Sequence, residues 1–99
     1  METNNKNGCQ LCDATWGGEY WREIEGQNMY FCCNLCADAF ENIVNEVKRR
    51  TGWSTIEYLE LHGNYIKGGR ECVARNMGQI FRFYVRTYSD GRLMEFIER

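Results

Sequence analysis

Residues 30–40 read Tyr-Phe-Cys-Cys-Asn-Leu-Cys-Ala-Asp-Ala-Phe, and this stretch decides the fold of the chain. It contains three cysteines at the predicted start of a helix, namely Cys32, Cys33 and Cys36. A further pair, Cys9 and Cys12, lies upstream, and its two-residue spacing lets both sulfurs reach one ion from a tight turn. Thiolate sulfur is the donor that structural Zn²⁺ prefers, at the corners of a tetrahedron. The sequence therefore predicts one structural Zn²⁺ ion held by four cysteines.

The segments between and after these pairs predict a hairpin followed by a helix. Residues 19–24 and 29–31 read as short strands joined by turn residues, which predicts a β-hairpin. Residues 32–50 carry apolar side chains at helical spacing, and the N-cap residue type Asn34 places the helix start near that position. A knuckle, a hairpin and a helix that carries the last ligands form the treble-clef arrangement of zinc fingers, which we expect for residues 9–50.

The remainder of the chain predicts a short helix and a sheet. Ser54 and Glu57 have the spacing of a capping box, so a second short helix is expected to begin there and to end at Gly63. After Tyr65 the period changes to two, which predicts three antiparallel strands. These are residues 71–75, 79–88 and 92–97. We therefore expect an α+β fold, a small zinc-stabilised single domain over 1–99, with 1–8 as a flexible tail, 9–50 as the zinc-binding part and 51–99 as helix plus β-meander.

The cellular compartment of the protein decides whether its six cysteines are interpreted as metal ligands or as disulfides. The first residues lack the apolar core of a signal peptide, and no stretch approaches the roughly 20 apolar residues that span a bilayer. A cytoplasmic location with no membrane is therefore expected, where thiols stay reduced. This favours metal binding over three disulfides, although disulfides and an iron–sulfur cluster remain as alternatives.

The stretch around Phe31 resembles the second half of the TRASH/YHS metal-binding families. Their pattern is aromatic-Phe-Cys-Ser-x-x-Cys-x-x-x-Phe, after an upstream Cys-x-x-Cys and a hairpin, and the similarity covers roughly residues 9–45. Spacing alone does not choose between Cys32 and Cys33, but the resemblance implies that Cys32 and Cys36 are the ligands and that Cys33 occupies the serine position. The chain as a whole also resembles a small archaeal family of zinc-binding proteins.

Other residues whose side chains could take part in catalysis or metal binding have ordinary structural interpretations. Cys72 stands alone on a predicted strand and is expected to be a small buried hydrophobe. His62 is the only histidine and is expected in a solvated position near the end of the short helix. The aromatic residues Trp16, Tyr20 and Trp21 are expected to cover the knuckle and the helix. Because no triad, phosphate loop or paired carboxylates stand out, we do not expect an enzyme.

Charge is unevenly distributed along the chain. Residues 1–63 carry five basic and ten acidic side chains, whereas residues 64–99 carry seven basic and four acidic ones. Five arginines in the second half lie among aromatic residues on predicted strands, as base stacking and phosphate contact require. These residues are Arg70, Arg75, Arg82, Arg86 and Arg92, with Phe81, Phe83 and Tyr84. The alternative is that the rings form the core beneath a solvated arginine face.

The expected function is that of a zinc-binding module with a structural four-cysteine site, whose partner is a protein or a nucleic acid such as RNA or DNA. Four protein ligands leave zinc no open position for water or substrate. The alternative is a heavy-metal sensing or trafficking protein with an exchangeable thiolate site. That alternative depends on the resemblance and on Cys33, a spare thiol beside the predicted ligands.

Overall fold

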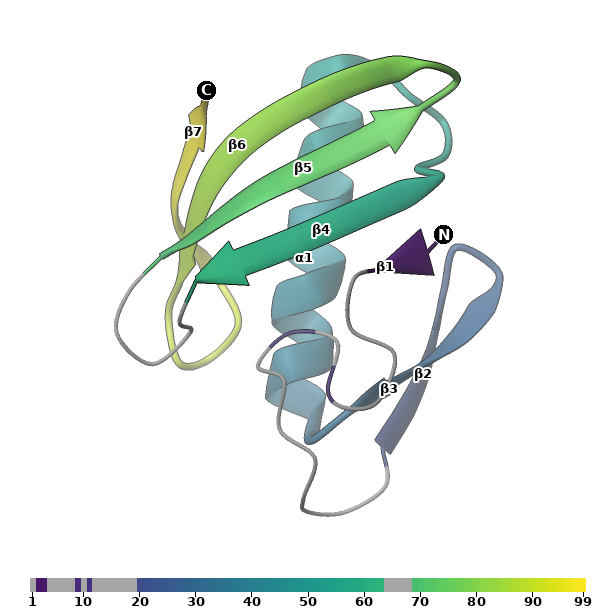
Figure 1. Cartoon of the computed structure of the whole chain (residues 1–99). Helices are drawn as coiled ribbons and strands as arrows, with labels where there is room; N and C mark the ends of the chain where they lie inside the picture. The colour runs from purple at the N-terminus through teal and green to yellow at the C-terminus, as the bar shows by residue number, and fades with distance from the viewer. Residues whose placement is uncertain (1, 4–8, 10, 12–19, 64–68) are drawn as a thin grey trace.

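The computed structural model describes residues 2–3, 9, 11, 20–63 and 69–99. The elements of this part of the chain, in order, are β1 (Glu2–Thr3), β2 (Tyr20–Ile24), β3 (Gln27–Phe31), α1 (Asn34–Thr51), β4 (Tyr58–Gly63), β5 (Arg70–Asn76), β6 (Gln79–Thr87) and β7 (Leu93–Glu98). Five strands form one sheet in the order β1-β4-β5-β6-β7, and β2 and β3 pair separately. Figure 1 shows α1 behind this sheet and the β2–β3 hairpin beside the lower end of the helix. The predicted α+β class is confirmed, with one described helix.

The β2–β3 hairpin and the helix both form where the sequence predicts them. The hairpin turns on Glu25 and Gly26, which have φ of 58° and 74°, so its loop is shorter than the predicted turn. The helix ends at Gly52, whose left-handed φ of 79° allows its N–H to donate to the Lys48 oxygen at 2.8 Å. The predicted cap Asn34 is instead the first helical residue, and the extended Cys33 is the N-cap.

The short helix predicted from Ser54 to Gly63 is wrong, because β4 occupies most of that segment. Leu59 and Leu61 are buried while the neighbouring His62 is exposed, which is the alternation of a strand. β4 pairs antiparallel with β5 along its full length, from Tyr58–Arg75 to Gly63–Arg70. A local capping signal is worth about 1 kcal/mol, and a full ladder of strand hydrogen bonds with two buried leucines outweighs it.

The flexible tail predicted for residues 1–8 needs correction at two positions. Glu2 and Thr3 form β1, which pairs parallel with Tyr58 and Leu59. The Glu2 N–H donates to the Glu57 oxygen at 2.9 Å, and Thr3 is buried. The partner strand lies more than fifty residues away, so no local pattern signals this contact.

The three predicted strands of the meander are confirmed as β5, β6 and β7. Consecutive strands pair antiparallel, and the β6–β7 register shifts at a bulge between Arg86 and Thr87. On the inner face the Phe83 and Phe96 rings stack with centroids 4.6 Å apart. Phe81 lies in the same stack, 5.6 Å from Phe83. Phe81 and Phe83 belong to the core, so of the two interpretations of these rings the structure supports the one with the rings in the core and not the one with exposed stacking platforms.

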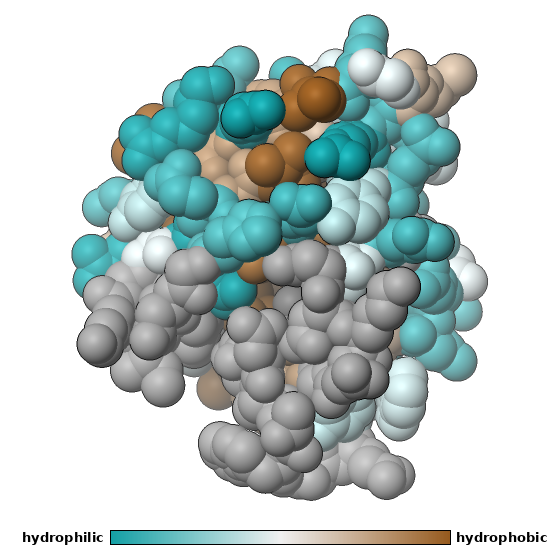
Figure 2. Space-filling model, viewed as in Figure 1, coloured by the Kyte–Doolittle hydropathy of each residue, from teal (hydrophilic) through white to brown (hydrophobic). Residues whose placement is uncertain are grey.

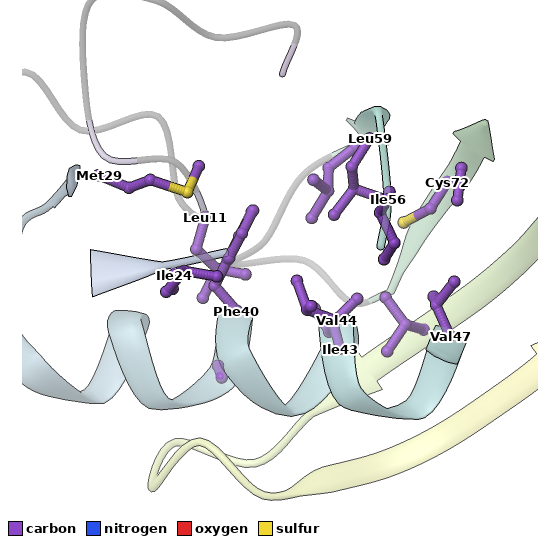
Figure 3. Close-up of a cluster of buried hydrophobic side chains, with 14 of the residues drawn as sticks. Leu11, Ile24, Met29, Phe40, Ile43, Val44, Val47, Ile56, Leu59 and Cys72 are labelled. Atoms are coloured by element: carbon purple, nitrogen blue, oxygen red, sulfur yellow. The ribbon is translucent and has the colours of Figure 1, made fainter. Parts of the chain in front are cut away.

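One face of α1 supplies the other half of the core. In Figure 3 its side chains point toward two groups, one around Leu11, Ile24 and Met29 and the other around Ile56, Leu59 and Cys72. The helix contributes Phe40, Ile43, Val44 and Val47, all at most 2% exposed. This face therefore joins Leu11 and the hairpin to the five-stranded sheet in one core.

The outer face of the sheet has no described element packed on it. Figure 2 shows apolar patches on this face surrounded by polar side chains. Ile80 and Ile97 are 55% and 45% exposed. The Arg99 guanidinium lies 5.1 Å from the Tyr84 ring centroid and pairs with Glu71 at 3.0 Å. Arg99 thus binds both an aromatic ring and a carboxylate on this surface.

Candidate metal centre

Three cysteine sulfurs gather at the point where β3 meets the helix. The Sγ atoms of Cys9, Cys32 and Cys36 all lie within 4.8 Å of one another. The Cys32 and Cys36 sulfurs are 3.5 Å apart. Cys9 and Cys36 are buried, whereas Cys32 is half-buried. Residues far apart in the chain are therefore brought into one compact thiol cluster, which can hold a metal ion.

The donor set matches what a tetrahedral ion requires. Zn–S bonds of about 2.3 Å at tetrahedral angles place sulfurs about 3.8 Å apart. The 3.5 Å separation of Cys32 and Cys36 is close to that value, and the 4.8 Å limit for the whole group needs only a small contraction. Sulfur donors without carboxylates are typical of structural Zn²⁺ or of an iron–sulfur cluster.

Local structure explains why Cys32 and Cys36 converge. Cys32 directly follows β3, and Cys36 is the third residue of α1, so one turn of chain separates their side chains. The first N–H groups of a helix have no intrahelical partner, and the helix dipole favours negative charge there. The site thus lies where backbone electrostatics stabilise thiolates.

Cys33 lies beside the cluster without belonging to it. Its sulfur is 3.9 Å from that of Cys32. The group of sulfurs that all lie within 4.8 Å of one another contains Cys32 and not Cys33. The backbone N–H of Cys36, followed by that of Leu35, lowers the pKa of the Cys33 thiol, although neither forms a well-aligned hydrogen bond to the sulfur. Cys33 is thus an N-cap residue whose thiol has a lowered pKa.

Cys12, the remaining predicted ligand, lies outside the described residues, as does Trp16. Leu11, next to Cys12 in the chain, is 1% exposed and belongs to the core. Tyr20 is half-buried and packs on the core, as expected, whereas Trp21 is 59% exposed and makes an edge contact with Tyr30. The described cluster therefore supplies three of the four predicted ligands.

The other candidate groups lie apart from the cluster. Burial raises the pKa of the Cys72 thiol to about 12, as expected for an inert buried cysteine. His62 is exposed on β4 rather than on a helix, and its Nε2 lies 2.9 Å from a Glu60 carboxylate oxygen. Neither residue adds a donor to the described cysteine group.

The sequence predicts Arg70 on a basic surface, but the structure places its side chain in the interior. Arg70 is only 3% exposed and donates to backbone carbonyl oxygens, one of which belongs to Leu11. The signal was present in the period of β5, because Arg70 shares its face with Cys72 and Ala74, and both of those are buried. Arg70 is therefore a structural residue next to the knuckle.

The chain belongs to the Ta0938 family, whose model matches residues 6–99. Comparison with curated proteins gives no match, and neither does comparison with solved structures. No helix in the described part of the chain has the length and apolar character needed to cross a membrane. The matched region includes all four predicted metal ligands and the strands β2 to β7, whereas β1 lies outside it.

Proposed function

We propose that this member of the Ta0938 family is a zinc-binding protein in which Cys9, Cys12, Cys32 and Cys36 hold one structural Zn²⁺ ion. The observation that carries the proposal is the convergence of the Cys9, Cys32 and Cys36 sulfurs within 4.8 Å. Cys12 completes the set by its spacing from Cys9. The proposed knuckle, hairpin and helix form a treble clef, as the similarity to TRASH/YHS proteins implies.

Four thiolates fill the tetrahedral shell of the ion, so the proposed zinc has no open position for water or substrate. Its role is to hold the knuckle against the hairpin and the helix. In a chain of 99 residues the core is thin, and a metal contributes a large share of the folding free energy. The proposed activity is thus binding of a partner in the cytoplasm and not catalysis.

The partner class in this proposal is a protein or a nucleic acid. With Phe81 and Phe83 buried, the side chains left for nucleic acid on the outer face include the exposed Arg75, Arg82 and Arg86 and the half-buried Tyr84. Binding of a labelled single-stranded RNA should weaken steeply with salt if phosphates are contacted. Absence of RNA binding would leave a protein as the partner class, whereas RNA binding that is unaffected by an Arg82→Ala and Arg86→Ala double substitution would place the contact away from these two arginines.

Metal content tests the ligand set directly. Elemental analysis of the purified protein is expected to find one zinc per chain in the wild type and in the Cys33→Ser and Cys72→Ser variants. Cys32→Ser is expected to lose or weaken binding, because it removes a thiolate from the cluster. Iron and inorganic sulfide in place of zinc would contradict the choice of metal. Loss of metal in Cys33→Ser, with Cys32→Ser unaffected, would transfer the ligand role to Cys33.

A metal-handling role is the second candidate, and the position of Cys33 favours it. Its sulfur, 3.9 Å from that of Cys32, is near enough to replace a ligand during metal exchange. An exchangeable site releases its ion to a chelator while the fold persists, whereas a structural site holds the ion until the protein unfolds. Removal of the metal therefore has a different effect on the fold under each of the two candidate functions.

A further inference from the structure

Arg70 connects the end of two sheet strands to the N-terminal knuckle. Its Nε donates to the His62 carbonyl oxygen at 3.1 Å, and Nη2 donates to that of Leu61 at 3.2 Å. Both acceptors lie near the end of β4. Its Nη1 donates to the carbonyl oxygen of Leu11, which stands between Cys9 and Cys12 in the chain. One side chain thus binds β4 and the segment that carries the first pair of cysteines.

The chemistry of the guanidinium makes this connection rigid. Arginine presents its N–H donors in a planar fork, so three acceptors bound at once are fixed relative to one another. A buried guanidinium must also keep its N–H donors hydrogen-bonded, because a donor without an acceptor loses its hydration free energy and gains no hydrogen bond in exchange. Since Arg70 is only 3% exposed, Leu11 is held at a defined place against β4.

We propose that Arg70 is a positioning residue for the metal site, an inference that rests on the proposed zinc function. By holding the Leu11 carbonyl, Arg70 sets where Cys9 presents its sulfur to the half of the site formed by Cys32 and Cys36. Four thiolates around Zn²⁺ also leave the centre negatively charged, and a buried guanidinium beside the knuckle offsets part of that charge. In this proposal Arg70 acts through its hydrogen bond to the backbone carbonyl oxygen of Leu11.

Two substitutions separate the shape of the guanidinium from its charge. Arg70→Lys keeps the charge but loses the fork, and Arg70→Met removes both. Val85→Ala is the matched control, because Val85 is 1% exposed and pairs directly with Arg70 across the sheet. It lowers stability at the same place without touching Leu11. For each protein, the rate of Zn²⁺ transfer to an excess of a coloured chelator and the affinity for Co²⁺ are measured under folding conditions.

Substitution of residues that orient metal ligands typically weakens metal binding by about 10–100-fold. We expect Arg70→Met to weaken Co²⁺ binding and to speed Zn²⁺ release by about tenfold or more. Arg70→Lys is expected to lie between Arg70→Met and the wild type, with Val85→Ala close to the wild type despite its lower free energy of unfolding. The Co²⁺ absorption bands should shift only in the Arg70 variants, because they report ligand geometry.

The inference is overturned if the Arg70 variants and Val85→Ala show the same metal affinity and the same Co²⁺ spectrum. If Arg70→Met does not fold, Arg70→Lys is compared with Val85→Ala, and equal metal affinity and an equal Co²⁺ spectrum in these two variants overturn the inference. A wild-type protein that binds no thiophilic metal overturns the proposed function as well. Metal binding by the wild type with no effect at Arg70 overturns this inference alone.

Discussion

Gly91 lies where the turn between β6 and β7 meets the helix. Its φ is 93°, in the left-handed region, and its carbonyl oxygen accepts a hydrogen bond from the Asn42 amide at 2.8 Å. A Cβ atom at this position would lie 3.1 Å from the Cβ of Asp38 and 3.2 Å from the Leu35 oxygen. The turn therefore fits the helix only because residue 91 has no side chain.

We expect Gly91→Ala to lower the free energy of unfolding by about 2 kcal/mol, because a strained φ and a steric contact add together. Urea denaturation followed by circular dichroism measures this change. Gly78→Ala is the matched control, since Gly78 has a similar φ of 80° but nothing within 4 Å of the added atom. Equal losses in the two variants would show that packing against the helix adds nothing.

At the scale of single residues, the sequence predicted the cysteines of the thiol cluster better than it predicted the residues around them. Cys9 and Cys36 could be assigned from spacing, because the geometry of a metal ion is known in advance. Cys32 was chosen over Cys33 by resemblance, and the sulfur positions group Cys32 with the others. The burial of Arg70 was missed because arginine is rarely buried, although Arg70 shares the period of two that places Cys72 and Ala74 in the core.

The last turns of α1 contain an ion-pair network centred on Glu46. Its carboxylate accepts hydrogen bonds from Arg49 at 3.0 Å and from Arg50 at 2.7 Å. The bond from Arg49, with that from Arg50, lowers the pKa of Glu46 to about 2. In an unfolded chain a glutamate titrates near pH 4.3, so the network stabilises the folded state above about pH 4.3. That contribution disappears as the pH falls toward 2.

We expect Glu46→Gln to lower the free energy of unfolding at pH 7 by less than about 1 kcal/mol, because Arg49 is largely exposed and solvent screens the pair. The difference from the wild type should shrink as the pH is lowered from 5 to 3. Denaturation of both proteins at several pH values, with the same excess of Zn²⁺ in each sample, measures it. Glu95→Gln on the exposed part of β7 is the control, and a similar pH-dependent difference there would contradict the assignment.

At the scale of elements, periodicity was the reliable signal and capping chemistry was not. The alternation of Phe81, Phe83 and Val85 predicted β6, and the helical stripe predicted α1, because each pattern repeats over many residues. β4 was predicted as a helix because Ser54 and Glu57 resemble a cap, although Leu59 and Leu61 already alternate with polar neighbours. The pairing of β4 with β5 decides between the two states, and that contact is not local.

The whole molecule depends on one core that joins the knuckle, the hairpin and the sheet through α1. Removal of the metal by a chelator at pH 7 is therefore expected to collapse the tertiary structure, because four thiolates would no longer be held together. Amide resonance dispersion in a nitrogen–proton NMR spectrum, recorded before and after chelation and again after Zn²⁺ is returned, tests this. Metal loss with unchanged dispersion would instead favour an exchangeable site for metal handling.

At this scale the order of the meander could be predicted, because consecutive strands joined by short turns pair with each other. The position of β1 could not be, since a parallel contact of two residues has no sequence signature. The attachment of the hairpin to the helix was also not predicted. It includes an ion pair between Arg22 and Asp38 and another between Glu25 and Lys48 at 2.6 Å.

The parallel pairing of β1 with β4 has a consequence for the order of events at the ribosome. Glu2 and Thr3 are synthesised more than fifty residues before their partners Tyr58 and Leu59. Cys9 likewise waits for Cys32 and Cys36 before the thiols can meet. With translation at about 5–20 residues per second, the amino-terminal segment therefore spends seconds without its partners. β1 can therefore pair with β4 only after the segment that forms β4 has been synthesised.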